Sequence, residues 1–203
     1  MAVAACSSDS EPTAVPTDAP APSPAAEAAA GSPDGLLTQG GTANEPRPAP
    51  ELVDLVTADG APFYLADHAG VNTLVFFGYT HCPDVCPATI GEIFGVFEAA
   101  PETAAVFISV DPERDTPEFL SEWTQYFPEQ FTAVTGSPGA IRRAADNYGV
   151  KYARVETTST AGYTMSHTAS VYLIDEAGQL RQTYPFGTPA QDIVADLDAR
   201  TAG

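Results

Sequence analysis

Continuous apolar runs alternate with helix-period segments through most of the chain after residue 70. Three runs of β-type residues predict buried strands: 72–79, 103–111 and 131–136. Each is followed by a helical signature, either apolar residues at helical spacing over 87–100 or a capping residue plus proline at Thr116-Pro117 and Ser137-Pro138. This order predicts an α/β sheet with right-handed crossovers.

Hairpins are expected on both sides of this alternation. Residues 52–65 hold two short apolar stretches around the turn signal Asp59-Gly60, and residues 168–186 alternate around a turn that ends at Gly178. A final helix fits 189–200. We therefore expect a central mixed sheet flanked by helices, preceded by an N-terminal hairpin and closed by an antiparallel edge.

The composition changes near residue 50. Residues 1–50 are rich in proline, alanine, serine and threonine and contain no aromatic residue. Such a segment cannot bury enough apolar surface to offset the entropy lost on ordering. We expect a disordered, semi-extended tether over 1–50 and one folded domain over 51–203.

The first residues suggest attachment to a membrane. Val3-Ala4-Ala5-Cys6 resembles a bacterial lipobox, in which small residues precede a cysteine that is lipidated. On that interpretation the protein is an extracytoplasmic lipoprotein of the cell membrane, and an apolar signal segment is expected upstream. The alternative is an isolated cysteine in a tail. The sequence contains no run of about 18 apolar residues, which is the length that would predict a transmembrane helix.

The formal net charge is −19. No basic face is apparent, which argues against nucleic-acid binding. Such a charge favours the binding of cations or of a basic partner surface. The simpler alternative is that the acidic surface keeps an exported protein soluble.

The stretch "FFGYTHCPDVCPATI" places Cys82 and Cys86 just beyond the carboxyl end of a predicted buried strand. Ligand sites of open α/β sheets favour that edge. The two sulfurs should lie close together near a helix N-terminus, where partial positive charge favours thiolates.

Three uses of this pair compete. A structural disulfide would close a tiny loop and constrain the unfolded chain little. A redox couple would fit the strand, cysteine pair and helix arrangement of thioredoxin-like oxidoreductases, although those usually separate the cysteines by two residues rather than three. A metal site would need at least one further ligand.

Few residues can supply that ligand, because the chain has three histidines. His68 falls in a polar turn, and His81 should point away from its neighbour Cys82. His167 precedes a predicted strand that could flank the cysteine strand. Two thiolates and one imidazole suit Cu(I), Cu(II) or Zn(II), and copper fits better because a structural zinc site would need a fourth ligand.

Three segments, "GYTHCPDVCPATI", "VFISVDPERDTPE" and "SHTASVYLID", closely resemble the Sco/SenC family over about residues 50–200. The resemblance implies a thioredoxin-like fold that is anchored to a membrane and faces an oxidising compartment. It implies copper bound by Cys82, Cys86 and His167. It also implies that the protein delivers copper to the CuA site of cytochrome c oxidase subunit II, or reduces that site's cysteines.

The D-P-E-R-D-T segment has two interpretations. Asp111 ends the strand beside the cysteine strand, so its carboxylate could approach the site and tune the metal. Alternatively, Asp111-Pro112 starts a turn in which Arg114 pairs with Asp115 or Glu118.

Two functions from different classes remain. One is a copper metallochaperone, which is not an enzyme in the strict sense, serving the oxidase or another copper client. The other is a thiol-disulfide oxidoreductase or peroxidase that uses Cys82 and Cys86. The two cysteines can bind copper only when they are reduced and not joined in a disulfide, so the first function depends on a thiol reductant.

Overall fold

The computed structural model describes residues 1, 41–158 and 162–201. Most of the predicted tether, including the predicted lipidation site Cys6, lies outside the described residues.

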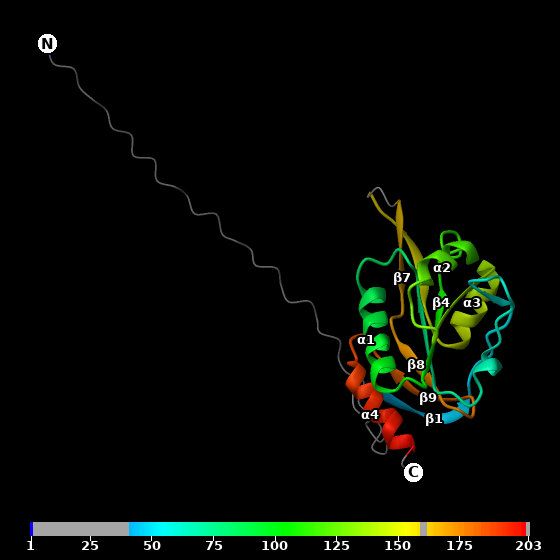
Figure 1. Ribbon diagram of the computed structural model, residues 1–203. Helices are drawn as coiled ribbons and strands as arrows, with labels where there is room; N and C mark the ends of the chain where they lie inside the picture. The colour runs from blue at the N-terminus through cyan, green and yellow to red at the C-terminus, as the bar shows by residue number, and fades with distance from the viewer. Residues whose placement is uncertain (2–40, 159–161, 202–203) are drawn as a thin grey trace. The chain divides into compact units, whose positions relative to one another are not determined.

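A seven-stranded mixed sheet forms the centre of the molecule, in the order β1-β9-β8-β3-β4-β5-β2 (Figure 1). Its strands are β1 (Thr42–Pro48), β2 (Leu55–Thr57), β3 (Thr73–Gly78), β4 (Ala104–Ser109), β5 (Phe131–Gly136), β8 (Val171–Ile174) and β9 (Gln179–Tyr184). Strands β3, β4 and β5 are parallel, and the other pairings are antiparallel. The α/β prediction is confirmed, and the three central strands lie within two residues of their predicted bounds.

The helices are α1 (Val85–Ala99), α2 (Pro117–Thr124), α3 (Pro138–Asn147) and α4 (Ala190–Thr201), with a short 3-10 helix η1 (Leu65–His68). The predicted caps are present: Thr116 accepts a hydrogen bond from the Phe119 N–H, and Ser137 accepts one from the Ala140 N–H. Gly149, at φ 71°, follows α3, as a C-terminal stop requires.

Helices cover both faces of the sheet, so β3 and β4 are buried along their whole length. Apolar residues of α1, α2 and α4 pack with Phe76, Phe107 and Phe131 on one face. Apolar residues of α3 pack with Phe77 and Tyr172 on the other, and that second cluster also contains both cysteines of the pair. The cysteines therefore sit at the edge of the core.

The N-terminal side differs from expectation at two places. Residues 42–48, assigned to the tether, form β1, which pairs antiparallel with β9. Its polar, mostly exposed side chains give no apolar pattern, because backbone hydrogen bonds hold the strand. The predicted N-terminal hairpin is also incomplete: the turn at Gly60 forms, but only an isolated bridge joins Val56 to Pro62, and β2 pairs with β5 instead. Proline lacks the N–H that a longer ladder needs.

A further hairpin was not predicted. Strands β6 (Tyr152–Glu156) and β7 (Tyr163–His167) form a separate two-stranded sheet, which Figure 1 shows extending past the end of the main sheet. Their sequences, YARVE and YTMSH, are too polar to show strand alternation. His167 is the last residue of β7, and the chain then enters β8 beside β3.

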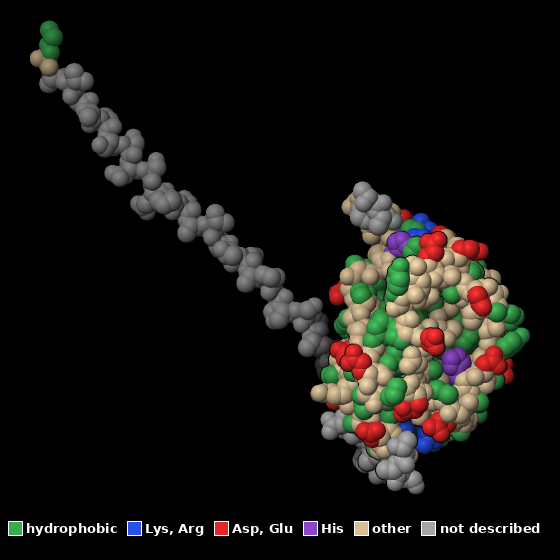
Figure 2. All heavy atoms as spheres, viewed as in Figure 1, with side chains coloured by type: hydrophobic (Ala, Val, Ile, Leu, Met, Phe, Trp, Pro, Cys, Tyr) green, Lys and Arg blue, Asp and Glu red, His purple; other side chains and the backbone are tan. Residues whose placement is uncertain are grey.

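The surface is strongly acidic, and Figure 2 shows Asp and Glu side chains scattered over the visible face with few Lys or Arg. Within the described part of the chain, no helix has the length and apolar character needed to cross a membrane.

Candidate metal centre

The end of β3 is shaped to admit a sulfur atom. A Cβ on Gly78 would lie 2.8 Å from the Cys86 Sγ and 2.9 Å from the Phe107 Cε2. No side chain other than glycine's leaves this space open. The chain then turns, and the Cys82 N–H donates to the Tyr79 carbonyl at 3.2 Å. Cys86 follows in the first turn of α1, so its sulfur lies close to that of Cys82.

Cys82 takes the place of a capping side chain. The N-cap residue of α1, Asp84, makes no side-chain hydrogen bond to the helix, and the Cys86 N–H donates to the Cys82 Sγ at 3.4 Å instead. A free N–H of a helix N-terminus therefore points at this sulfur.

His167 approaches the pair from β7. Its Nε2 lies 3.5 Å from the Cys86 Sγ, and its Nδ1 lies 3.1 Å from the Thr168 carbonyl oxygen. Because a carbonyl oxygen only accepts hydrogen bonds, Nδ1 carries the proton. Nε2 therefore presents its lone pair to the cysteines, which is the tautomer that a metal ligand needs.

The ligand atoms of Cys82, Cys86 and His167 all lie within 4.8 Å of one another. Both cysteines are free and buried, and His167 is partly buried. Two sulfurs and one imidazole nitrogen suit a soft or borderline ion. Among the described residues this is the one group of histidine, cysteine and acidic side chains close enough to hold a metal.

Burial dominates the electrostatics of the site. It raises the pKa of the Cys86 thiol far above its usual range, and it lowers the pKa of His167. The expectation that the helix N-terminus would favour thiolates is wrong for Cys86. That residue is only 4% exposed, so the cost of burying a thiolate outweighs the helix dipole. A metal that binds Cys86 must therefore displace a proton.

Asp111 contacts the hairpin. Its carboxylate accepts hydrogen bonds from the Tyr163 hydroxyl at 2.8 Å and from the Arg114 Nε. Arg114 also donates to the Tyr163 carbonyl at 3.3 Å, and its guanidinium stacks over the Tyr163 ring. The expected pairing of Arg114 with Asp115 or Glu118 is therefore wrong, and Asp111 holds the start of β7.

Asp115 is the carboxylate that sequence reasoning missed. It is buried and accepts hydrogen bonds from the Thr80 N–H at 3.0 Å, from the Thr80 hydroxyl at 2.6 Å and from the Ser109 hydroxyl at 2.6 Å. It thus fixes the loop just before Cys82. The sequence shows that Asp115 follows a strand within D-P-E-R-D-T, but it does not show that Asp115 bonds Thr80 and Ser109.

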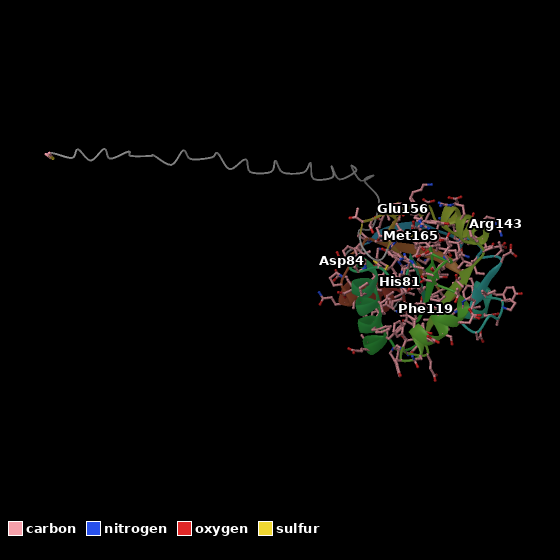
Figure 3. All side chains as sticks on the ribbon, turned by 90° about the horizontal axis from the view of Figure 1, so that it is seen from above. His81, Asp84, Phe119, Arg143, Glu156 and Met165 are labelled. Atoms are coloured by element: carbon pink, nitrogen blue, oxygen red, sulfur yellow. The ribbon has the colours of Figure 1, made fainter. Side chains whose placement is uncertain are left out.

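His81 turns away from the cysteines, as expected. Its Nδ1 lies 2.9 Å from the Thr80 hydroxyl, and its ring stacks on Phe119 with centroids 5.5 Å apart. Figure 3 shows these two side chains next to each other and also labels Met165, a residue of β7. His68 lies in η1, in contact with the Phe63 ring, and is not part of the group.

Most of the chain is similar to proteins of one known family. The family described as SCO1/SenC matches residues 45–202. A SCO2-like protein of Rickettsia prowazekii is 33% identical over 146 residues, which cover 70% of this chain and 71% of that protein.

Two solved structures are similar over most of the chain. Bradyrhizobium japonicum ScoI with copper bound shares 35% identity at a TM-score of 0.64, covering 77% of this chain and 99% of the other. Apo Sco1 from Thermus thermophilus shares 33% identity at a TM-score of 0.66, covering 81% and 98%.

Proposed function

The chain belongs to the SCO1/SenC family, and from that premise we propose that it is a copper metallochaperone that binds Cu(I) and Cu(II) through Cys82, Cys86 and His167. One observation carries the proposal: two sulfurs and an imidazole nitrogen lie within 4.8 Å of one another. The similarity to a copper-bound ScoI supports copper as the ion.

The donor set fits both oxidation states. Soft thiolates suit Cu(I), and two of them hold this ion without further ligands. Cu(II) is harder and gains most from the imidazole nitrogen. His167 presents Nε2 in the required tautomer, so the metal-free protein already has its third ligand oriented.

Metal analysis of the reduced protein tests this proposal. Wild type should bind copper stoichiometrically, and Cys82→Ser and Cys86→Ser should each abolish tight Cu(I) binding, because a serine hydroxyl is a hard, protonated donor. His167→Ala should weaken Cu(II) binding far more than Cu(I) binding. His68→Ala is the matched control, since burial lowers the pKa of that histidine too but it lies outside the group. A wild type that takes up no copper refutes the proposal.

The client we propose is the CuA site of cytochrome c oxidase subunit II, with another copper client as the alternative. Family membership supports this choice. The reduced pair can bind copper and a Cys82–Cys86 disulfide cannot, so a thiol reductant is a second partner. Mixing the copper-loaded protein with a separately purified CuA domain and following the CuA absorption tests the transfer. Copper that stays with the donor would exclude that client.

A thiol-disulfide oxidoreductase or peroxidase is the second candidate, favoured by two free cysteines whose sulfurs lie within 4.8 Å. Against it, burial raises the pKa of Cys86, and a neutral thiol is a poor nucleophile. His167 separates the two functions, because copper binding needs it and disulfide exchange does not. A strain in which His167→Ala is fully functional and Cys86→Ser is not would favour the oxidoreductase.

We also propose that the protein is an extracytoplasmic lipoprotein held to the cell membrane through Cys6. The lipobox-like Val3-Ala4-Ala5-Cys6 and the tether-like composition that follows support it. In the native host, wild type should fractionate with membranes and a Cys6→Ala precursor should not. Membrane association that survives this substitution would remove the lipid anchor.

A further inference from the structure

The third ligand lies on a separate sheet from the cysteines. Among the described strands, β7 pairs with β6 and makes no ladder with the seven-stranded sheet that carries the cysteine loop. The nearest ladder places His167 only indirectly, because β8, which pairs with β3, begins at Val171. Side-chain contacts between the hairpin and the residues that follow β3 act beside this backbone link.

Tyr79 is in contact with two of the three candidate ligands, Cys82 and His167. Its carbonyl accepts from the Cys82 N–H at 3.2 Å. Its ring meets the His167 ring edge-on, with centroids 5.9 Å apart. Its hydroxyl lies 2.5 Å from the Thr164 Oγ1, three residues before His167 on β7. The side chain is 2% exposed, so it has little room to move.

We propose that Tyr79 is a positioning residue for the third copper ligand: its hydroxyl, bonded to Thr164, fixes β7 at the distance from which His167 reaches the metal. The inference rests on the proposed function and adds a residue to it. The two hydroxyls join the loop that carries Cys82 and leads into α1 directly to the strand that carries the histidine.

A second set of contacts holds the neighbouring residue of β7, Tyr163. Tyr163 bonds Asp111, and its ring lies between the guanidiniums of Arg114 and Arg154, at 3.8 and 3.7 Å. Adjacent strand residues point to opposite faces, so Tyr163 and Thr164 are held from different sides. Arg114 also lies over the Tyr79 ring, 5.8 Å from its centroid, but the Thr164 hydroxyl is the group of β7 that bonds the Tyr79 hydroxyl directly.

The phenylalanine substitution isolates the hydroxyl, because Tyr79→Phe keeps the ring and its edge contact with His167. Thr164→Val removes the other hydroxyl with little change of shape, and Thr164→Ser keeps it. Tyr148→Phe is the matched control: Tyr148 is also buried and its hydroxyl bonds a carbonyl, that of Pro50, away from the site. All variants are prepared reduced and metal-free as the full chain.

Three measurements follow. Tyr79→Phe and Thr164→Val should each weaken Cu(II) binding about fivefold, the worth of one hydrogen bond, and shift the sulfur-to-copper charge-transfer band. The double variant should lose no more than the larger single loss, because both changes remove one interaction. Cu(I) affinity should stay within about twofold of wild type. In the metal-free protein, amides of β7 should exchange about fivefold faster.

The outcomes separate this inference from the proposed function. A wild type that binds no copper overturns the proposed function. A wild type and a Tyr148→Phe variant that bind normally, beside a Tyr79→Phe variant with unchanged Cu(II) affinity and band, overturn the positioning role alone. Unchanged exchange of β7 amides in metal-free Tyr79→Phe also overturns it. Recovery of the wild-type band in Thr164→Ser supports it.

Discussion

Replacing Gly78 by alanine should disturb the site more than any other single methyl group. The new Cβ would lie 2.8 Å from the Cys86 Sγ, and ordinary contact begins at about 3.4 Å, so the sulfur would have to move by about 0.6 Å. Phe107, 2.9 Å away on the other side, is fully buried against the rings of Phe76 and Trp123 and cannot yield. The methyl group would therefore strain both the packing of Phe107 and the position of the Cys86 sulfur.

Both stability and metal binding should respond. Overpacking of a core costs about 1–3 kcal/mol, which in a domain of this size lowers the melting temperature by about 2–12 °C. Metal sites tolerate ligand shifts of only about 0.2 Å, so we expect copper affinity to fall by at least about tenfold. Differential scanning calorimetry of the metal-free protein measures the first effect, and chelator competition measures the second.

Gly91→Ala is the matched control. It adds the same methyl group to α1, at an exposed position where the new Cβ meets nothing within 4 Å beyond its own stretch of helix backbone. It should raise stability by about 0.5–1 kcal/mol, as alanine does inside a helix, and leave copper affinity unchanged. If Gly78→Ala melts and binds copper like wild type, the sulfur of Cys86 does not lie against the end of β3.

Three further outcomes follow from the charges. Because burial raises the pKa of Cys86, Cu(I) binding should release at least one proton, and apparent affinity should rise by at least about tenfold per pH unit between pH 6 and 8. A flat profile in competition titrations would contradict this. Burial lowers the pKa of His68, so the unfolded chain binds more protons at this residue than the folded chain does. The stability that neutral His68 contributes is present above pH 6.5 and is lost as the pH falls towards the folded pKa. His68→Gln should therefore flatten that part of the pH profile of stability, measured by urea denaturation. Asp111→Asn leaves the mostly buried Arg114 without its charged partner and should lower the free energy of unfolding by about 3 kcal/mol in urea denaturation. Asp54→Asn removes an exposed ion pair and should lower it by under about 1 kcal/mol. Equal losses would remove the structural role assigned to Asp111.

The central sheet could be predicted because its strands are buried on both faces and so appear as continuous apolar runs. The helix starts could be predicted because Thr116 and Ser137 carry local capping chemistry. Strands β1, β6 and β7 could not, because they are polar and are held by pairing with distant partners. The pairing of β1 with β9 joins opposite ends of the folded domain, which no local window of sequence contains.

The candidate site divides in the same way. Cys82 and Cys86 were placed by their position between a strand and a helix, and His167 entered through ligand chemistry and family resemblance. Gly78, Tyr79 and Asp115 were not identified. Their roles depend on distances across the fold, such as the contact of Tyr79 with Thr164, 85 positions along the chain. The charge state of Cys86 also required knowledge of its burial.

His167 comes from the β6–β7 hairpin, whereas Cys82 lies in the loop after β3 and Cys86 lies in α1, so the proposed copper binding would be coupled to the position of the hairpin. A metal held by the cysteine loop and by β7 must favour the docked hairpin by the free energy that His167 adds to binding. Reciprocity then applies: any molecule that prefers the hairpin displaced weakens the metal's hold by the same factor by which the metal weakens its own. A recipient protein could thus promote release of the ion by binding β6 and β7, before it contacts either sulfur.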